Sequence, residues 1–208
     1  MTIRSDISIR AVIFDLGGVL VRTSDFGPRE RLAKQFGMTL DELMDLVFAH
    51  EAGKRAQLGE VTYEQHWEYL RQVLGLSQLE LQVVQKIFWE KDFVDLELVN
   101  TLRRIRSTHH TALLSNAFSD LRQVVTERME FADAFDEMII SSEVHMMKPD
   151  PAIYYLAAER LNIPAEQAVF VDDVLRNVEG AQAVGMQGIQ YKNTPQVLAE
   201  LGVLLNGR

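Results

Sequence analysis

The run Ala11-Val-Ile-Phe14, followed at once by Asp15-Leu16-Gly17-Gly18, decides how this chain is expected to fold. Its first four residues are apolar and two of them are β-branched, which is typical of a short strand buried on both faces. The paired glycines indicate a tight turn directly after the carboxylate. The sequence therefore predicts a buried strand that ends at Asp15.

The stretch that follows this strand, from about Pro28 to Glu90, has helical periodicity. Apolar residues share one helical face in three successive segments: Leu43, Leu46 and Val47; Trp67, Leu70 and Leu74; and Leu81, Val84 and Phe88. No strand-like alternation interrupts the stretch. We therefore predict an all-helical unit over 21–95, inserted into a core formed by 1–20 and 96–208.

The remainder of the chain alternates between strand and helix patterns. Short apolar strands are expected at 111–114, 138–140, 168–171 and 188–191, with helical segments between them. This alternation is typical of an α/β fold, and it predicts a Rossmann-like parallel sheet covered by helices on both faces.

Composition narrows the possible partners. A chain of 208 residues suffices for one core with one insertion. The 21 basic and 30 acidic residues give a net charge of −9, which argues against nucleic acid as a partner. Cysteine is absent, so disulfides and thiolate metal sites are excluded. Because no segment has a long apolar run, we expect a cytoplasmic protein without a membrane partner. We expect a monomer or a homodimer.

Polar residues collect where the predicted strands end. Asp15 follows the first strand, the pair Ser115-Asn116 follows the second, and the pair Asp172-Asp173 follows the strand at 168–171, while Lys148 precedes a proline in a loop. Ligands bind at the carboxyl edge of open parallel sheets, so these groups are expected to converge. Singly, each has a plainer interpretation as a helix cap or a solvated residue. Two adjacent aspartates behind a buried strand, however, repel each other unless a cation or hydrogen bonds offset the charge.

Four segments carry a resemblance to a known family. They are Phe14-Asp-Leu-Gly-Gly-Val-Leu20, Leu114-Ser-Asn116, Met147-Lys-Pro-Asp150 and Val171-Asp-Asp-Val-Leu-Arg-Asn177. In order, spacing and strand context they resemble the four motifs of the haloacid dehalogenase-like hydrolase superfamily, and residues of about 20 to 95 resemble its helical cap. The chain is most similar to small phosphatases of that superfamily, including those acting on sugar phosphates and the phosphatase domain of soluble epoxide hydrolases.

The resemblance implies a magnesium site and a covalent nucleophile. Asp15 would attack phosphorus and form an aspartyl-phosphate that water later hydrolyses. Magnesium typically takes one or two carboxylates together with phosphate oxygens and water. By family analogy, its ligands here would be Asp15, the backbone carbonyl of Gly17, and Asp173. Asp172 would stand behind them, orienting the lysine or a metal-bound water, with Asn177 as the last polar residue of the motif.

The resemblance also implies a phosphate-binding set. Ser115 and the backbone N–H of Asn116 would hold a phosphoryl oxygen, and Lys148 would place a charge between the nucleophile and the phosphate.

One position departs from the family pattern. Phosphatases of the superfamily generally carry a second Asp two residues after the nucleophile, which protonates the leaving group and later activates water; here that residue is Gly17. Dehalogenases also lack it, but they do not need the acidic pair. The sequence therefore predicts a magnesium-dependent phosphatase acting on a small phosphorylated metabolite, such as a sugar phosphate, without the usual general acid. The alternative is a catalytically weak or silent member that binds a phosphorylated ligand or a protein.

Other conspicuous residues are assigned no site. All five histidines are predicted to be surface or loop residues: His50, His66, His109, His110 and His145. Lys54 and Arg55 are expected in a loop bounded by glycines, either solvated or reaching toward a substrate.

Overall fold

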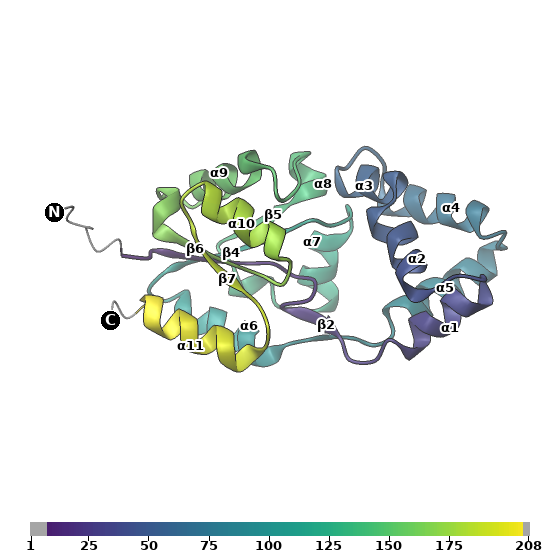
Figure 1. Cartoon of the computed structure of the whole chain (residues 1–208), viewed down its shortest axis with the longest axis horizontal. Coiled ribbons are helices and arrows are strands. Elements are labelled where there is room, and N and C mark those ends of the chain that lie inside the picture. The colour runs from purple at the N-terminus through teal and green to yellow at the C-terminus, as the bar shows by residue number, and fades with distance from the viewer. Residues whose placement is uncertain (1–7, 206–208) are drawn as a thin grey trace.

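The computed structural model describes residues 8–205 and has a five-stranded parallel sheet at its centre (Figure 1). The strand order is β5-β4-β1-β6-β7, and the strands are β1 (Ala11–Phe14), β4 (His110–Ser115), β5 (Glu137–Ile140), β6 (Ala168–Asp172) and β7 (Gln187–Gln190). The predicted parallel sheet and the predicted strand positions are thus confirmed. The outermost parts of the predicted core, residues 1–7 and 206–208, lie outside the described residues.

Strand β1 occupies the middle of the sheet because both of its faces are apolar. Its register places Phe14 opposite Leu113 of β4 and Val171 of β6. All four of its residues are at most 1% exposed. The residue that follows β1 is therefore delivered to the centre of the sheet's carboxyl edge.

Helices cover both faces of the sheet, as predicted. On one face, α6 (Leu96–Ile105) and α11 (Thr194–Leu205) pack against Val12 and Phe14. On the other face, α9 (Pro151–Arg160) and α10 (Leu175–Ala183) pack against Ala11 and Ile13. Alternate residues of one strand point to opposite faces, so β1 contributes to both apolar layers. Figure 1 shows the two helix layers above and below the sheet.

Short helical segments complete the core. They are α7 (Leu121–Gln123), a π-helical turn at Val124–Arg128, 3-10 turns at Ala132–Ala134 and Ala165–Gln167, and α8 (Ser141–Val144). Within residues 8–205, no helix is both long enough and apolar enough to cross a membrane.

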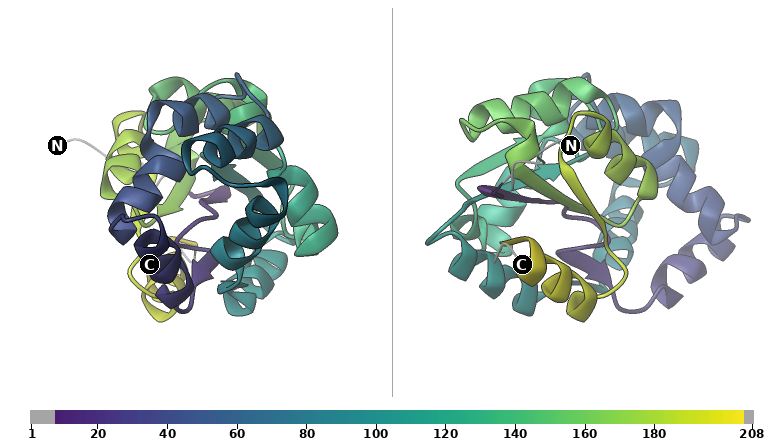
Figure 2. Two further views of the ribbon diagram at one scale, coloured as in Figure 1. Left: turned by 90° about the vertical axis from the view of Figure 1, so that its right-hand side faces the viewer. Right: turned by 60° about the vertical axis from the view of Figure 1, so that its left-hand side comes forward.

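A second, helical layer lies beyond the carboxyl ends of the strands (Figures 1 and 2). Its elements are α1 (Gly27–Gln35), α2 (Leu40–Met44), a π-helical turn (Asp45–Ala49), α3 (Glu51–Gln57), α4 (Tyr63–Val73) and α5 (Gln78–Trp89). Capping boxes at Thr39, Thr62 and Ser77 fix where α2, α4 and α5 begin. These helices, which we call the cap, have an apolar core of their own around Trp67, Leu70 and Phe88.

The cap is joined to the core by a two-stranded antiparallel ribbon that the sequence pattern missed. Strand β2 (Val21–Thr23) pairs with β3 (Asp92–Val94). Each strand has only three residues, which is too short for an alternating pattern to be recognised in the sequence. Because of this ribbon, the unit at 21–95 is not helical throughout, although the sequence had predicted it to be. The predicted boundaries fall at the start of β2 and just after β3, and the division into two domains stays a prediction.

Two predictions within the cap are wrong. Lys54 and Arg55 lie in helix α3 and not in a loop. Gly53, which suggested a break, is a helical residue at which a Cβ would lie 2.6 Å from the Val47 carbonyl oxygen, so glycine permits a close approach. His66 is not on the surface: it lies in α4 and is 1% exposed. The other four histidines are partly or largely exposed.

Candidate active site

The carboxyl edge of the central strands brings Asp15 beside Asp172. Asp15 follows β1, Asp172 is the last residue of the neighbouring β6, and the Asp15 backbone N–H donates to the Val171 carbonyl at 2.9 Å. Parallel pairing of β1 and β6 therefore places two carboxylates next to each other, with side chains 11% and 0% exposed.

Lys148 lies between these two carboxylates. Its Nζ is 2.8 Å from Asp15 Oδ1 and 2.7 Å from Asp172 Oδ2, and its side chain is 1% exposed. Its Nζ lies over the ring of Phe170, 5.3 Å from the ring centroid. A buried cation is stable only where anions pair with it, so the lysine and the two aspartates form one electrostatic unit.

Asn116 holds the backbone of Lys148 in place. The Asn116 amide donates to the Lys148 carbonyl at 2.9 Å, and the Lys148 N–H donates to Asn116 Oδ1 at 2.8 Å. Ser115, the last residue of β4, is 3% exposed at the same edge of the sheet. The structure thus brings the Ser115-Asn116 pair to the lysine, and it gives the asparagine side chain a positioning role that the sequence did not suggest.

Asp172 has its hydrogen-bonding capacity filled by the protein. Besides Lys148, its carboxylate accepts from the Val174 N–H at 2.8 Å and from Asn177 Nδ2 at 3.1 Å. Asn177 is itself held, because the buried Tyr154 hydroxyl donates to its carbonyl at 2.8 Å. Asp172 is therefore suited to fixing the lysine.

Asp173 is placed differently from its neighbour. It is partly exposed and makes no ion pair within the described residues. Burial raises the pKa of its carboxyl, and the nearby Asp172 raises it further. Its carboxylate lies against Gly18, where a Cβ would come within 2.2 Å of Oδ2 and where φ is +77°. The left-handed backbone and the close carboxylate both favour glycine at that position.

Acidic groups outnumber basic groups around Asp15. Burial raises the pKa of Asp15 to about 6, with Asp172 acting in the same direction and Lys148 opposing both. One lysine thus faces three acidic groups. In this environment, an additional cation would favour the ionised form of the carboxyl.

The three aspartates fit a hard metal ion. One carboxylate oxygen from each of Asp15, Asp172 and Asp173 lies within 4.8 Å of the others. Magnesium prefers such oxygen ligands. Since the Asp172 oxygens are already engaged, Asp15 and Asp173 are the carboxylates with capacity to spare, which fits the predicted ligand set.

Gly17 leaves open space beside this cluster. A Cβ built at Gly17 would meet no atom within 4 Å, and its φ lies outside the left-handed region. Among the described residues, none crowds the point where a side chain would leave the backbone at this position.

Two contributors could not be assigned from the sequence. Gly18 belongs to a quoted motif, but its contact with Asp173 depends on the fold. Tyr154 lies in α9, and its hydroxyl bond to the Asn177 carbonyl in α10 has no sequence signal.

Known proteins resemble this chain over most of its length. The family model described as "Hydrolase: haloacid dehalogenase-like hydrolase" matches residues 9–185. Bifunctional epoxide hydrolase 2 of Rattus norvegicus is 26% identical, and the match covers 93% of this chain but 38% of that protein's length. A phosphorylated carbohydrates phosphatase of Thermotoga maritima is 29% identical, with 87% of this chain and 84% of that protein covered.

A solved structure shares the fold. It is a HAD family enzyme from Bacteroides thetaiotaomicron in complex with magnesium and inorganic phosphate, with a TM-score of 0.73, 22% identity, and coverage of 89% of this chain and 95% of that one. The sheet order, the cluster at its carboxyl edge and the family match over most of the chain agree. This chain therefore belongs to the haloacid dehalogenase-like hydrolase family.

Proposed function

We propose that this protein is a magnesium-dependent phosphatase that hydrolyses a small phosphorylated metabolite, with sugar phosphates as the leading class, through an aspartyl-phosphate on Asp15. The observation that carries the proposal is the bridge of Lys148 between Asp15 and Asp172, with Asp173 alongside. The name of the Thermotoga maritima relative, which acts on phosphorylated carbohydrates, supports the substrate class.

The reaction needs the charge of the phosphate to be offset before a carboxylate can approach. Lys148 is held near the nucleophile and supplies one positive charge. Magnesium, when bound, supplies the remaining neutralisation of the phosphoryl oxygens. Asp15, the carbonyl of Gly17 and Asp173 would hold the ion.

The two covalent steps require only the ester and water. An Asp15 carboxylate oxygen forms a bond to phosphorus while the ester P–O bond breaks, and the leaving group departs with its electron pair and takes up a proton from water. Water then attacks the aspartyl-phosphate, releasing inorganic phosphate and restoring the carboxylate. Ser115 and the Asn116 N–H would hold a phosphoryl oxygen during both steps.

The cheapest test is hydrolysis of a panel of phosphate esters with magnesium, and with magnesium removed by a chelator. We expect metal-dependent release of phosphate from at least one sugar phosphate. A folded protein that releases no phosphate from any ester, acyl phosphates included, would contradict the proposal and favour the silent, ligand-binding alternative, for which Gly17 is the argument.

A further inference from the structure

The end of strand β5 carries a polar group that has no role in the site as described so far. Ser141 follows Ile140, the last residue of β5, and Ile140 pairs with Ser115 of β4. Ser141 therefore lies at the same carboxyl edge of the sheet as the Ser115-Asn116 pair. The residue is 0% exposed, so its hydroxyl has to find hydrogen-bond partners within the protein.

One of these partners belongs to residues 115–117, which we call the phosphate loop. The Ala117 N–H donates to Ser141 Oγ at 2.9 Å. Ala117 directly follows Asn116, whose side chain exchanges two hydrogen bonds with the backbone of Lys148. The hydroxyl of Ser141 is thus bonded to the residue next to the one that holds the lysine.

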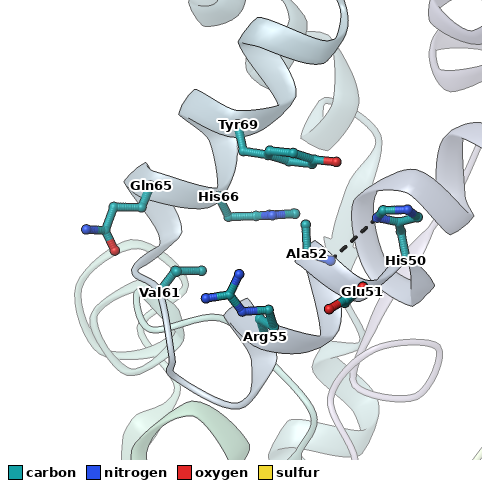
Figure 3. Close-up of a pocket in the computed structure, with 8 residues that line it drawn as sticks. All are labelled: His50, Glu51, Ala52, Arg55, Val61, Gln65, His66 and Tyr69. Atoms are coloured by element: carbon teal, nitrogen blue, oxygen red, sulfur yellow. Dashed lines mark hydrogen bonds between the residues drawn. The ribbon is translucent and has the colours of Figure 1, made fainter.

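The other partner is a helix of the cap. Helix α3 lies beside α4 (Figure 3) and ends at Gln57. Near its carboxyl end, the carbonyls of Lys54, Arg55 and Ala56 accept from N–H groups of the turn that follows the helix. The Gln57 carbonyl instead accepts from the Ser141 hydroxyl at 2.6 Å. A single buried hydroxyl of the core therefore joins the cap to the phosphate loop.

The next carbonyl of the same turn is also bonded to the core. His145 Nδ1 is 2.8 Å from the Leu58 carbonyl oxygen, which can only accept, so Nδ1 carries the hydrogen. The carboxyl end of an α-helix leaves carbonyl groups without partners inside the helix. Since Ser141 and His145 supply donors for two carbonyls at this end, the docked position of the cap satisfies groups that would otherwise need water.

Two carbonyls compete for the single hydrogen of the Ser141 hydroxyl. Besides the Gln57 carbonyl at 2.6 Å, the Ala117 carbonyl lies 3.3 Å from Ser141 Oγ. With the cap docked, the shorter bond holds the hydrogen on Gln57 and leaves the oxygen lone pairs to the Ala117 N–H. Without Gln57, the Ala117 carbonyl is the remaining acceptor among the described residues. The orientation of the hydroxyl, and its hold on Ala117, therefore depend on the position of the cap.

We propose that Ser141 is a positioning residue that couples docking of the cap to the placement of the phosphate loop and, through Asn116, to that of Lys148. The inference rests on the proposed function only in assigning phosphate to this loop and lysine, because the hydrogen bonds exist without it. Coupling between two sites is reciprocal, so phosphate bound at the loop should in turn favour the docked cap.

The test is NMR spectroscopy of the intact, ¹⁵N-labelled protein without metal or phosphate, with the Ala117 amide as the readout. Ser141→Ala removes the acceptor of this N–H, so its resonance should move and its hydrogen exchange should become about tenfold faster. Amides of β1 provide the internal reference for global unfolding. The matched control is Ser142→Ala. Ser142 Oγ is buried and has no hydrogen-bond partner among the described residues, so its loss should leave the Ala117 amide unchanged.

His145→Asp loosens the cap without touching Ser141. The position is exposed, and aspartate tolerates the left-handed backbone there, where φ is +56°. An ionised carboxylate cannot donate to the Leu58 carbonyl, so docking should weaken. We expect the Ala117 amide to move in the same direction as in Ser141→Ala. The double variant should move no further than Ser141→Ala alone, because both changes act through one hydroxyl.

Gly59→Ala is a stronger change on the cap side. A Cβ there would press against the Ser142 carbonyl oxygen, so the turn after α3 has to move away from the core. It should also move the Ala117 amide. Gly75→Ala is its control, because Gly75 has a similar φ of +68° but a Cβ there would meet no described atom within 4 Å. That variant should leave the Ala117 amide as it is in the wild type.

Phosphate affinity provides the functional readout. With magnesium present, inorganic phosphate should bind Ser141→Ala about tenfold more weakly than the wild type, and Ser142→Ala like the wild type. A wild type that binds no phosphate would count against the proposed function. The amide measurement would still decide the role of Ser141, because it needs neither metal nor phosphate.

Three results would overturn the proposal. An unchanged Ala117 amide in Ser141→Ala would show that the hydroxyl does not hold the phosphate loop. An amide that responds to Ser141→Ala, but to neither His145→Asp nor Gly59→Ala, would show that the loop does not sense the cap. Equal responses to Ser141→Ala and Ser142→Ala would show a general loosening of this edge of the sheet.

Discussion

At the scale of single residues, Asp15 has a position that no neighbouring side chain of the described residues shares. It is the carboxylate at the end of the central strand, and Lys148 is held against it. We therefore predict that Asp15→Asn leaves the fold intact and lowers phosphatase turnover by about three orders of magnitude or more. The measurement is kcat of the purified variant with the best ester, alongside its circular dichroism spectrum. Turnover close to the wild-type rate in a folded variant would rule out the covalent route.

Gly17 gives a second prediction, on the leaving group. A general acid typically contributes about 10²–10⁴-fold, so an enzyme without one should hydrolyse acyl and aryl phosphates far faster than alkyl phosphates. Gly17→Asp should flatten this dependence, because a Cβ there would meet no described atom within 4 Å and the backbone φ lies outside the left-handed region. The quantity to measure is kcat/KM across esters of different leaving-group pKa, in both proteins. A shallow slope in the wild type would mean that another group already donates the proton.

Some residue positions could be predicted from the sequence and others could not. Asp15, Lys148 and the Asp172-Asp173 pair could be predicted because strand ends of a parallel sheet converge. His66 was misplaced, since its helical face is buried against the carbonyl of Val47, a contact that no periodicity reveals. The role of the Asn116 side chain depends equally on a loop that only the fold brings near.

At the scale of elements, the end of β6 places two adjacent aspartates in different environments. Asp172 is fully buried with three hydrogen-bonding partners, whereas Asp173 is partly exposed and has no ion pair in the described part of the chain. We predict that Asp173→Ala weakens magnesium binding by about tenfold or more without destabilising the metal-free protein.

Asp172→Ala should behave differently. It leaves the buried Lys148 with one anion fewer and should cost about 3 kcal/mol of folding free energy, the usual penalty for breaking a buried ion pair. Calorimetric magnesium titrations and thermal melts of both variants separate the two effects. A reversed order of metal affinities would show that Asp172 is the direct ligand.

The turn after α3 docks the cap on the core. The Ser141 hydroxyl donates to the Gln57 carbonyl at 2.6 Å, and His145 Nδ1 is 2.8 Å from the Leu58 carbonyl oxygen. At Gly59, φ is +72°, and a Cβ would lie 2.0 Å from the Ser142 carbonyl oxygen. The backbone of the cap thus touches that of the core directly.

Gly75 supplies a matched control for this contact. It has a φ of +68°, but a Cβ there would meet nothing within 4 Å. We predict that Gly75→Ala costs about 1 kcal/mol from left-handed strain alone, and that Gly59→Ala costs clearly more because the docking contact is also lost. Urea unfolding of both variants measures the difference. Equal losses would mean that the cap can move away from Ser142 without a penalty.

The elements themselves were predictable to different degrees. Strands and helices of the core follow from alternation of apolar runs with helical periodicity, and they lie where the pattern predicts. The ribbon of β2 and β3 was missed because it joins two three-residue strands that are far apart in the sequence and have no pattern of their own. Helix α3 was missed because a glycine inside it resembles a break.

At the scale of the whole molecule, the described residues bring cap and core together mainly at two places, and Phe118 of the core also packs among the apolar residues of the cap. The ribbon connects them covalently, and Arg22 of β2 is 2.7 Å from Asp95, whose carboxylate also accepts from the Thr194 hydroxyl at the start of α11. The second place is the docking turn around Gly59, together with the bond from the Tyr63 N–H to Ser119 Oγ. Contacts at both places hold the cap beyond the carboxyl ends of the strands.

The charge cluster should also set how the stability of the whole protein depends on pH. The unfolded pKa of Asp15 is near 3.8 and the folded pKa is raised to about 6, first by burial and then by Asp172. Between these values the folded state holds a proton that the unfolded state has lost, so Asp15 makes the metal-free protein less stable as pH rises through this window. The raised pKa of Asp173 acts in the same direction.

Two measurable consequences follow, and they identify the group responsible. In metal-free protein, the stability of Asp15→Asn relative to the wild type should rise as pH increases from about 4 to about 6, because only the wild type loses the Asp15 proton over this window. Magnesium should oppose this trend, because it binds the ionised carboxyls: it should raise the Tm of the wild type more at about pH 7.5 than at about pH 5, where a proton must first be displaced. Scanning calorimetry of both proteins, with and without magnesium, measures each effect. If the pH profiles of the two metal-free proteins coincide, burial at the end of β1 does not shift the pKa of Asp15, and its carboxyl is ionised without help from a metal ion.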